Sequence, residues 1–217
     1  ENQVGQLRRS GQRELAGQLR SYLNRYKASW FTEQDRAVMK GRVAEAWGII
    51  RRLVNPAILE RMPRVDVQVD PFYKVPGILP NKDGSKRIQL VPNSSVKDIL
   101  HEFGHLVEDF GGVGPLATAH ALRTQRAYGG RPVWLGKLIE RTNYPRQQRG
   151  LRGGFLEPYM GRDYDRGWTE ILSMGLERME SRERALRFFQ LDGFHFLLTC
   201  SALQRSPVPS RSPASSR

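Results

Sequence analysis

Residues 95–112 read SVKDILHEFGHLVEDFGG, and this stretch decides the fold around it. Ser95 and Asp98 have the spacing of a capping box, in which each side chain bonds the backbone N–H of the other residue. Gly111 and Gly112 favour a helix stop. Apolar residues recur close to every 3.6 positions, at Val96, Ile99, Leu100, Phe103, Leu106, Val107 and Phe110. The stretch therefore predicts a capped helix with a strongly apolar face.

The predicted helix contains the pattern His-Glu-x-x-His, formed by His101, Glu102 and His105. Histidines four residues apart project from one face of a helix, so both imidazoles can bind one metal ion. Glu102 is offset around the helix, where it can act as general base on a water activated by the metal. This is the arrangement of zinc hydrolases. The alternative is a chance pattern on a surface helix, which the caps and the apolar face disfavour.

The length of 217 residues suffices for one sizeable domain, or for one domain with an appended piece. No apolar run reaches the length of a membrane-spanning helix, and the polar start lacks the apolar region of a signal peptide. We therefore expect a soluble protein, cytoplasmic or delivered into a target cell as part of a larger protein. The absence of an initial Met suggests a processed product or a piece of a longer chain. Cys200 is the only cysteine, so we expect no internal disulfide and a small core residue at this position.

The remaining patterns predict an α+β fold in three parts. A helical segment over 1–62 holds a pair of helices, one over 11–29 and one that opens at a capping box from Thr32 to Asp35. A domain over 63–203 combines a small mixed sheet with a mostly helical C-terminal part, and the Ser/Pro/Arg-rich tail 204–217 is expected to be disordered. The expected strands are 65–69, 73–79 and 87–91. The expected helices are 115–128, 168–179 and 182–189, followed by an apolar stretch over 194–203, with 129–154 as a hairpin or loop.

A catalytic zinc needs a third protein ligand, and Glu170 is the candidate. The metzincin pattern requires Gly and then His at the positions that Glu108 and Gly111 occupy, so it fails. Glu170 lies on the predicted helix from residue 168, and a buried carboxylate there needs a cation. Glu177, two turns further on, and His120 are weaker alternatives.

Three other residues near the predicted site have more ordinary expected roles. Asp109, four residues after His105, is a candidate hydrogen-bond partner of an imidazole. His195, between two phenylalanines, is expected to be a packed histidine. Tyr164 is the candidate donor to the oxyanion of the reaction, with Tyr159 as the alternative.

The segment GWTEILS, residues 167–173, resembles the G-x-x-N-E-x-x-S segment of the thermolysin-like gluzincins, with Thr169 in place of Asn. Residues 157–164 and 169–177 are similar to zincin-like domains of phage head-associated proteins and bacterial polymorphic toxins. The resemblance covers about residues 60–200. It implies a zincin-like fold and a zinc endopeptidase with His101, His105 and Glu170 as ligands and Glu102 as general base.

Two further features bear on partners. The strand expected at 87–91 leads into the active-site helix, so a substrate peptide could add to its edge. The segment 120–154 carries eight Lys or Arg residues against one acid, Glu140, which favours an acidic partner such as nucleic acid, an anionic membrane or an acidic protein. Besides an endopeptidase, the sequence leaves open a non-catalytic zincin-fold module of a phage particle and a protease acting on nucleic-acid-bound proteins.

Overall fold

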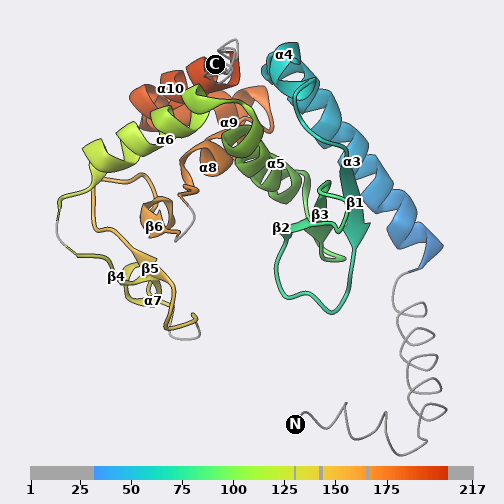
Figure 1. The fold of residues 1–217 in the computed structure, drawn as a ribbon, viewed down its shortest axis with the longest axis horizontal. Helices are drawn as coiled ribbons and strands as arrows, with labels where there is room; N and C mark the ends of the chain where they lie inside the picture. The colour runs from blue at the N-terminus through green and yellow to red at the C-terminus, as the bar shows by residue number, and fades with distance from the viewer. Residues whose placement is uncertain (1–31, 130, 142–143, 165–166, 205–217) are drawn as a thin grey trace, which may run out of the picture.

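The computed structural model describes residues 32–129, 131–141, 144–164 and 167–204. These residues form an α+β fold, as predicted, with eight α-helices and with a second three-stranded sheet besides the expected one (Figure 1). The helix expected over 11–29 and the tail from residue 205 lie outside the described residues. The sequence predicts Gln204 in the disordered tail, but it is the last residue of the C-terminal helix.

The first sheet contains β1 (Val65–Val69), β2 (Gly77–Pro80) and β3 (Lys86–Leu90) in the order β1-β3-β2. β1 runs parallel to β3, and β2 runs antiparallel to it. β2 begins only after Pro76, so the strand expected from residue 73 is shorter than predicted. The expectation of a free edge along residues 87–91 is wrong, because β3 is the central strand and its backbone groups pair on both sides.

The two long helices begin at the predicted capping boxes. Thr32 and Asp35 cap α3 (Glu33–Leu53), and Ser95 and Asp98 cap α5 (Val96–Phe110). α5 lies in the middle of the molecule, between the first sheet and the C-terminal helices (Figure 1). Ten of its residues are buried, which is why both of its histidines are held in a packed environment.

The C-terminal helices pack at the opposite side of α5 from the first sheet (Figure 1). They are α6 (Val113–Arg126), α8 (Ile171–Glu177), α9 (Arg182–Leu191) and α10 (Gly193–Gln204). α8 begins three residues later than predicted. Gly167 has a positive φ of 79°, and the Thr169 hydroxyl accepts the backbone N–H of Ile171 at 3.1 Å, so the chain turns through 167–170 before the helix starts.

Residues 133–163 form a small lobe around the second sheet. The sheet pairs β4 (Val133–Trp134), β5 (Arg149–Gly150) and β6 (Arg162–Asp163) in antiparallel order, with the short helix α7 (Leu135–Leu138) after β4 and the 3₁₀ turn η1 (Pro158–Gly161) before β6. The hairpin expected over 129–154 is present as β4 and β5. It also contains α7, whose four residues are too few to show a helical period.

One hydrophobic core joins the first sheet and the described helices other than α7. Ile50 of α3, Leu90 of β3, Leu100 of α5 and Leu172 of α8 all belong to it. α3 and the short helix α4 (Pro56–Leu59) thus share the core of the later residues. Cys200 is half-buried and packs against this core. None of the described helices is long and apolar enough to cross a membrane.

Candidate metal centre

The two histidines of the motif lie one turn apart on α5 and face the same carboxylate. Nε2 of His101 lies 3.1 Å from Oε2 of Glu170, and Nε2 of His105 lies 3.4 Å from the same oxygen. One donor atom from each of the three residues lies within 4.8 Å of the other two. Two imidazole nitrogens and one carboxylate oxygen are the donor set of a catalytic zinc with His₂Glu ligation, so these residues fit the metal that the sequence predicts.

Glu170 is the N-cap residue of α8, not a residue of the helix body as predicted. It is fully buried, and it reaches α5 because the two helices nearly touch. A Cβ on Gly104, inside the motif, would lie only 2.4 Å from Cα of Ser173. The absence of a side chain at Gly104 therefore allows the approach that brings Glu170 to the histidines.

Hydrogen bonds on both carboxylate oxygens hold Glu170 in place. Arg162 donates from Nη1 to Oε1 at 3.2 Å, and the Tyr164 hydroxyl contacts the same oxygen. Ser173 donates from Oγ to Oε2 at 3.0 Å. Burial alone would raise the pKa of Glu170, but the hydrogen bonds to His101 and His105 outweigh it and lower the pKa well below its usual range. The carboxylate is therefore anionic and ready to bind a cation.

Glu177, one of the weaker candidates for the third ligand, instead orients His101. Its Oε2 lies 2.9 Å from Nδ1 of His101, on the side of the ring away from Glu170. Lys97 lies 3.2 Å from the other oxygen of Glu177. A carboxylate on the second ring nitrogen fixes the tautomer and the direction of a metal-binding histidine.

His105 is oriented differently, by stacking. The Trp168 ring lies against it with centroids 5.7 Å apart and an angle of 20° between the planes. Its buried Nδ1 has no hydrogen-bond partner among the described residues, since the nearest carboxylate oxygen, on Glu108, is 3.8 Å away. Asp109, the expected partner of an imidazole, accepts a hydrogen bond from Nε1 of Trp168 instead, so that prediction is wrong.

Thr169 ties the turn before α8 to α5. Its backbone N–H donates to Oε2 of Glu108 at 2.9 Å, and its hydroxyl contacts the other oxygen of the same carboxylate. All of these groups are buried. The residue that departs from the thermolysin-like segment therefore clamps the ligand-bearing turn onto the motif helix.

The electrostatics of the two imidazoles follow from their carboxylate neighbours. Burial alone would lower the pKa of both, but hydrogen bonds to Glu170 and Glu177 raise the pKa of His101 to about 10. The nearby carboxylates of Glu108 and Glu170 raise the pKa of His105 to about 9. Glu102 is 7% exposed, and the loss of water around it raises its pKa, as suits a group that takes up a proton.

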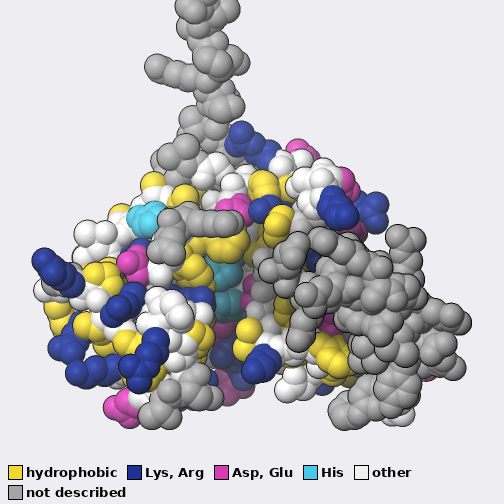
Figure 2. All heavy atoms as spheres, turned by 60° about the horizontal axis from the view of Figure 1, so that its bottom comes forward, with side chains coloured by type: hydrophobic (Ala, Val, Ile, Leu, Met, Phe, Trp, Pro, Cys, Tyr) yellow, Lys and Arg dark blue, Asp and Glu magenta, His cyan; other side chains and the backbone are white. Residues whose placement is uncertain are grey.

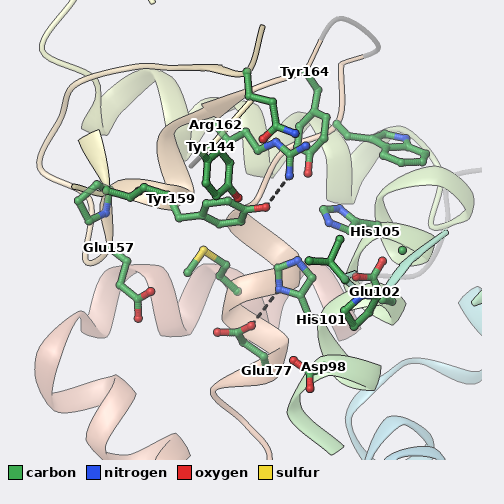
Figure 3. A pocket seen from close by; sticks show the side chains of 18 of the residues that line it. Asp98, His101, Glu102, His105, Tyr144, Glu157, Tyr159, Arg162, Tyr164 and Glu177 are labelled. Atoms are coloured by element: carbon green, nitrogen blue, oxygen red, sulfur yellow. Dashed lines mark hydrogen bonds and ion pairs between the residues drawn. The ribbon is translucent and has the colours of Figure 1, made fainter. Parts of the chain in front are cut away.

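A cavity of about 920 Å³ opens onto these residues. Figure 2 shows histidine side chains at the bottom of a hollow in the surface. Tyr144, Tyr159, Arg162 and Tyr164 lie on one side of the cavity, and Glu177 lies on the other, with the two histidines between them (Figure 3). The cavity gives a substrate access to His101, His105 and Glu102, whereas Glu170 lies buried behind the two histidines.

Arg162 is the functional candidate that the sequence interpretation missed. Its guanidinium lies 4.2 Å from the centre of the Tyr164 ring, and Nη1 also donates to the Tyr159 hydroxyl. Burial and the Glu170 carboxylate raise the pKa of both tyrosines, so their hydroxyls stay protonated. Arg162 lies within the segment that carries the phage and toxin resemblance, but nothing local marks its side chain as facing the metal ligands.

The remaining histidines lie outside the metal centre. His120 is not part of the metal-binding cluster found among the described residues. His195 is buried, and its Nε2 lies 2.9 Å from the carbonyl oxygen of Ile171, which confirms the predicted packed histidine. Its pKa is lowered, mainly by burial.

Three comparisons with known proteins find nothing similar to the chain. A scan against protein-family models finds no match, and searches of the curated proteins and of the solved structures find none either.

Proposed function

We propose that the chain is a zinc-dependent endopeptidase of the gluzincin type, with His101, His105 and Glu170 as metal ligands. The observation that carries the proposal is the meeting of these three donors beside Glu102, with the two histidines exposed to a cavity large enough for a peptide. The sequence alone requires only that two of the ligands share a helix face. The third comes from a turn 65 residues further on, and its fully buried carboxylate needs a cation.

Zinc, when bound, supplies a Lewis acid that polarises a carbonyl group and lowers the pKa of a water molecule towards neutrality. Glu102 takes the proton of the attacking water and passes it to the leaving amine, a task that its raised pKa favours. Glu177 and Trp168 keep the imidazoles of His101 and His105 in their ligand orientation.

Arg162 is the group best placed to stabilise the oxyanion. The hydroxyl of Tyr164, the predicted donor, is turned to Oε1 of Glu170, which makes Tyr164 a positioning residue for that ligand. Arg162 lines the cavity and has five N–H donors, of which Nη1 serves Tyr159 and Glu170. Its remaining donors and the adjacent Tyr159 are available for a substrate carbonyl oxygen as negative charge develops on it.

The substrate backbone has a place along β2. β2 is an outer strand of the first sheet, and two of its residues, Gly77 and Ile78, line the cavity. Backbone groups on its outer side can pair with an extended peptide as an added strand. The edge strand that serves the substrate is therefore β2 and not the strand at 86–90.

A purely structural zinc module is less well supported. Structural zinc sites are closed by four protein ligands, whereas catalytic sites keep one position open. Three donors gather here among the described residues, and the cavity reaches two of them, His101 and His105. The phage or toxin setting rests on the resemblance, and an adjacent capsid or immunity gene would support it.

The variant Glu102→Gln tests the proposal. It removes the base but no ligand, so we expect one zinc per chain, as in the wild type, and no cleavage of an unstructured protein such as casein. Glu45→Gln, at an exposed position of α3, is the matched control and should cleave normally. Retained cleavage by Glu102→Gln with unchanged zinc content would disprove the mechanism. A wild type that binds zinc but cuts nothing would favour the structural module.

A further inference from the structure

The lobe built on β4, α7 and β5 has a strongly basic surface. We call its exposed cations the basic lobe: Arg131, Lys137, Arg141, Arg146, Arg149 and Arg152. The only acid among residues 129–154 is Glu140. Figure 2 shows Lys and Arg side chains gathered to one side of the hollow that holds the histidines.

The cations of the basic lobe are exposed, and no acidic side chain in the described part of the chain pairs with them. None of the six forms an ion pair within the part of the chain that the structure describes, whereas two nearby arginines do. Arg123 pairs with Asp163, and Arg126 pairs with Asp192. Both arginines belong to the eight basic residues of segment 120–154, so six of the eight are left to attract an acidic partner. Six unpaired cations on one small lobe create a local positive potential that attracts anions.

The basic lobe is also a wall of the cavity. Residues 138–141, Tyr144 and Gln148 of the lobe line it, and Arg141 is itself one of the six cations. A chain that leaves the cavity on this side must pass over the lobe. The floor is mixed in charge, because the acids Asp98, Glu102 and Glu177 line it together with Lys97 and the two histidines.

We infer that the basic lobe binds an acidic segment of the protein substrate, a few residues away from the bond that is cleaved. The inference rests on the proposed peptidase function. A polypeptide can place a peptide bond at the proposed metal centre and acidic side chains on the lobe. Nucleic acid also carries the negative charge that the lobe attracts, but it offers no peptide bond to the proposed peptidase centre. The substrate class is therefore a protein with an acidic stretch beside the cleavage site.

Two fluorescein-labelled peptides test this inference by direct binding. They share an Ala-Phe-Leu-Ala centre, which is flanked on both sides by four Glu in one peptide and by four Gln in the other. The full chain carrying Glu102→Gln is loaded with zinc, so that neither peptide is cut, and binding is followed by fluorescence anisotropy. We expect the Glu-flanked peptide to bind at least about tenfold more tightly at low ionic strength, and the advantage to shrink as salt screens the charges.

Matched charge variants locate the effect. The triple variant Arg146→Gln, Arg149→Gln and Arg152→Gln leaves the cavity lining intact and should abolish the preference for the Glu-flanked peptide. The control Arg51→Gln, Arg52→Gln and Arg61→Gln removes the same charge from exposed positions on and near α3 and α4, away from the cavity, and should retain it.

Three outcomes overturn the inference: equal binding of the two peptides, an equal loss in both triple variants, or lobe-dependent binding of a DNA duplex without preference for the Glu-flanked peptide. Because anisotropy does not depend on turnover, these outcomes are distinct from failure of the peptidase proposal. That failure appears only as absent cleavage by the zinc-loaded wild type.

Discussion

The substitution Gly104→Ala tests whether the close contact of α5 and α8 builds the metal centre. Gly104 lies inside the motif, between the two histidine ligands, but it contributes no donor of its own. Its Cα faces the backbone of α8 near Ser173, three residues beyond Glu170. A methyl group there would push the third ligand away from the other two.

The structure sets the size of this displacement. An added Cβ would lie 2.4 Å from Cα and 2.7 Å from N of Ser173, and both are backbone atoms that no rotamer change can move. Ordinary contacts begin at 3.4 Å, so α8 must retreat by about 1 Å. Metal–ligand distances tolerate only about 0.2 Å. We expect zinc affinity to fall by at least about 100-fold, beyond the usual cost of losing an orienting partner.

The effect on folding should be smaller than the effect on zinc. Overpacking costs about 1–3 kcal/mol, against which alanine returns about 0.5–1 kcal/mol of helix propensity. Gly41→Ala is the matched control, because it lies in the helix α3 with nothing within 4 Å of its added Cβ. It should leave zinc affinity unchanged and raise the unfolding temperature slightly.

The assay is competition for zinc against a chromogenic chelator, with thermal unfolding of the metal-free protein alongside. If Gly104→Ala bound zinc within about threefold of the wild type and unfolded at the same temperature, the helix contact would not set the ligand position.

Three further predictions concern the groups around the ligands. Glu177→Gln should lower zinc affinity by about 10–100-fold in the same competition assay, because it loosens His101, and unchanged affinity would contradict that role. Since the pKa values of His101 and His105 are raised to about 10 and about 9, zinc must displace two protons at pH 7. The apparent zinc affinity should therefore rise with pH up to about 9–10, and calorimetry in buffers of different ionisation enthalpy should show the release of the two protons. The same raised pKa values stabilise the folded, metal-free protein. This stabilisation is complete below pH 6.5 and is lost as the pH rises towards 10. Both Arg162 and Tyr164 donate to Glu170, so zinc affinity should fall in both variants, but at saturating zinc only Arg162→Gln should lower kcat, by about 10²–10³-fold. A kcat loss confined to Tyr164→Phe at saturating zinc would assign the oxyanion to that tyrosine.

Much of the fold was predictable because its signals are local. The capping boxes at Thr32 and Ser95 begin both long helices where the sequence places them. The alternation over 65–69 gives β1 without change of bounds. The order of the strands was not predictable, because hydrogen bonding between β1 and β3 joins residues about 20 positions apart that no short window compares. The prediction that residues 87–91 form a free sheet edge is wrong for this reason.

The site residues also divide into those that local sequence signals predict and those that depend on distant parts of the chain. His101 and His105 follow from helix geometry alone, and Glu170 follows from a segment pattern. The role of Gly104 depends on a helix 69 residues further along the chain, and Trp168 stacks on His105 across a gap of 63 residues. Asp109 had the right spacing from His105 to orient it, but its side chain is taken by the Trp168 indole. Spacing on one helix indicates which residues share a face, but not which side chains from other elements form hydrogen bonds with them.

The charge balance of the centre explains why these separate contacts act as one unit. Glu170 and Glu177 are buried against His101, and Glu108 lies close to His105. Without a metal, the imidazoles must carry protons to balance the carboxylates, which is why their pKa values rise. A divalent cation can replace those two protons without any change in net charge and without moving a carboxylate. The same acids that orient the imidazoles therefore prepare the site for a dication, and a variant that neutralises one of them weakens both the orientation and the charge balance.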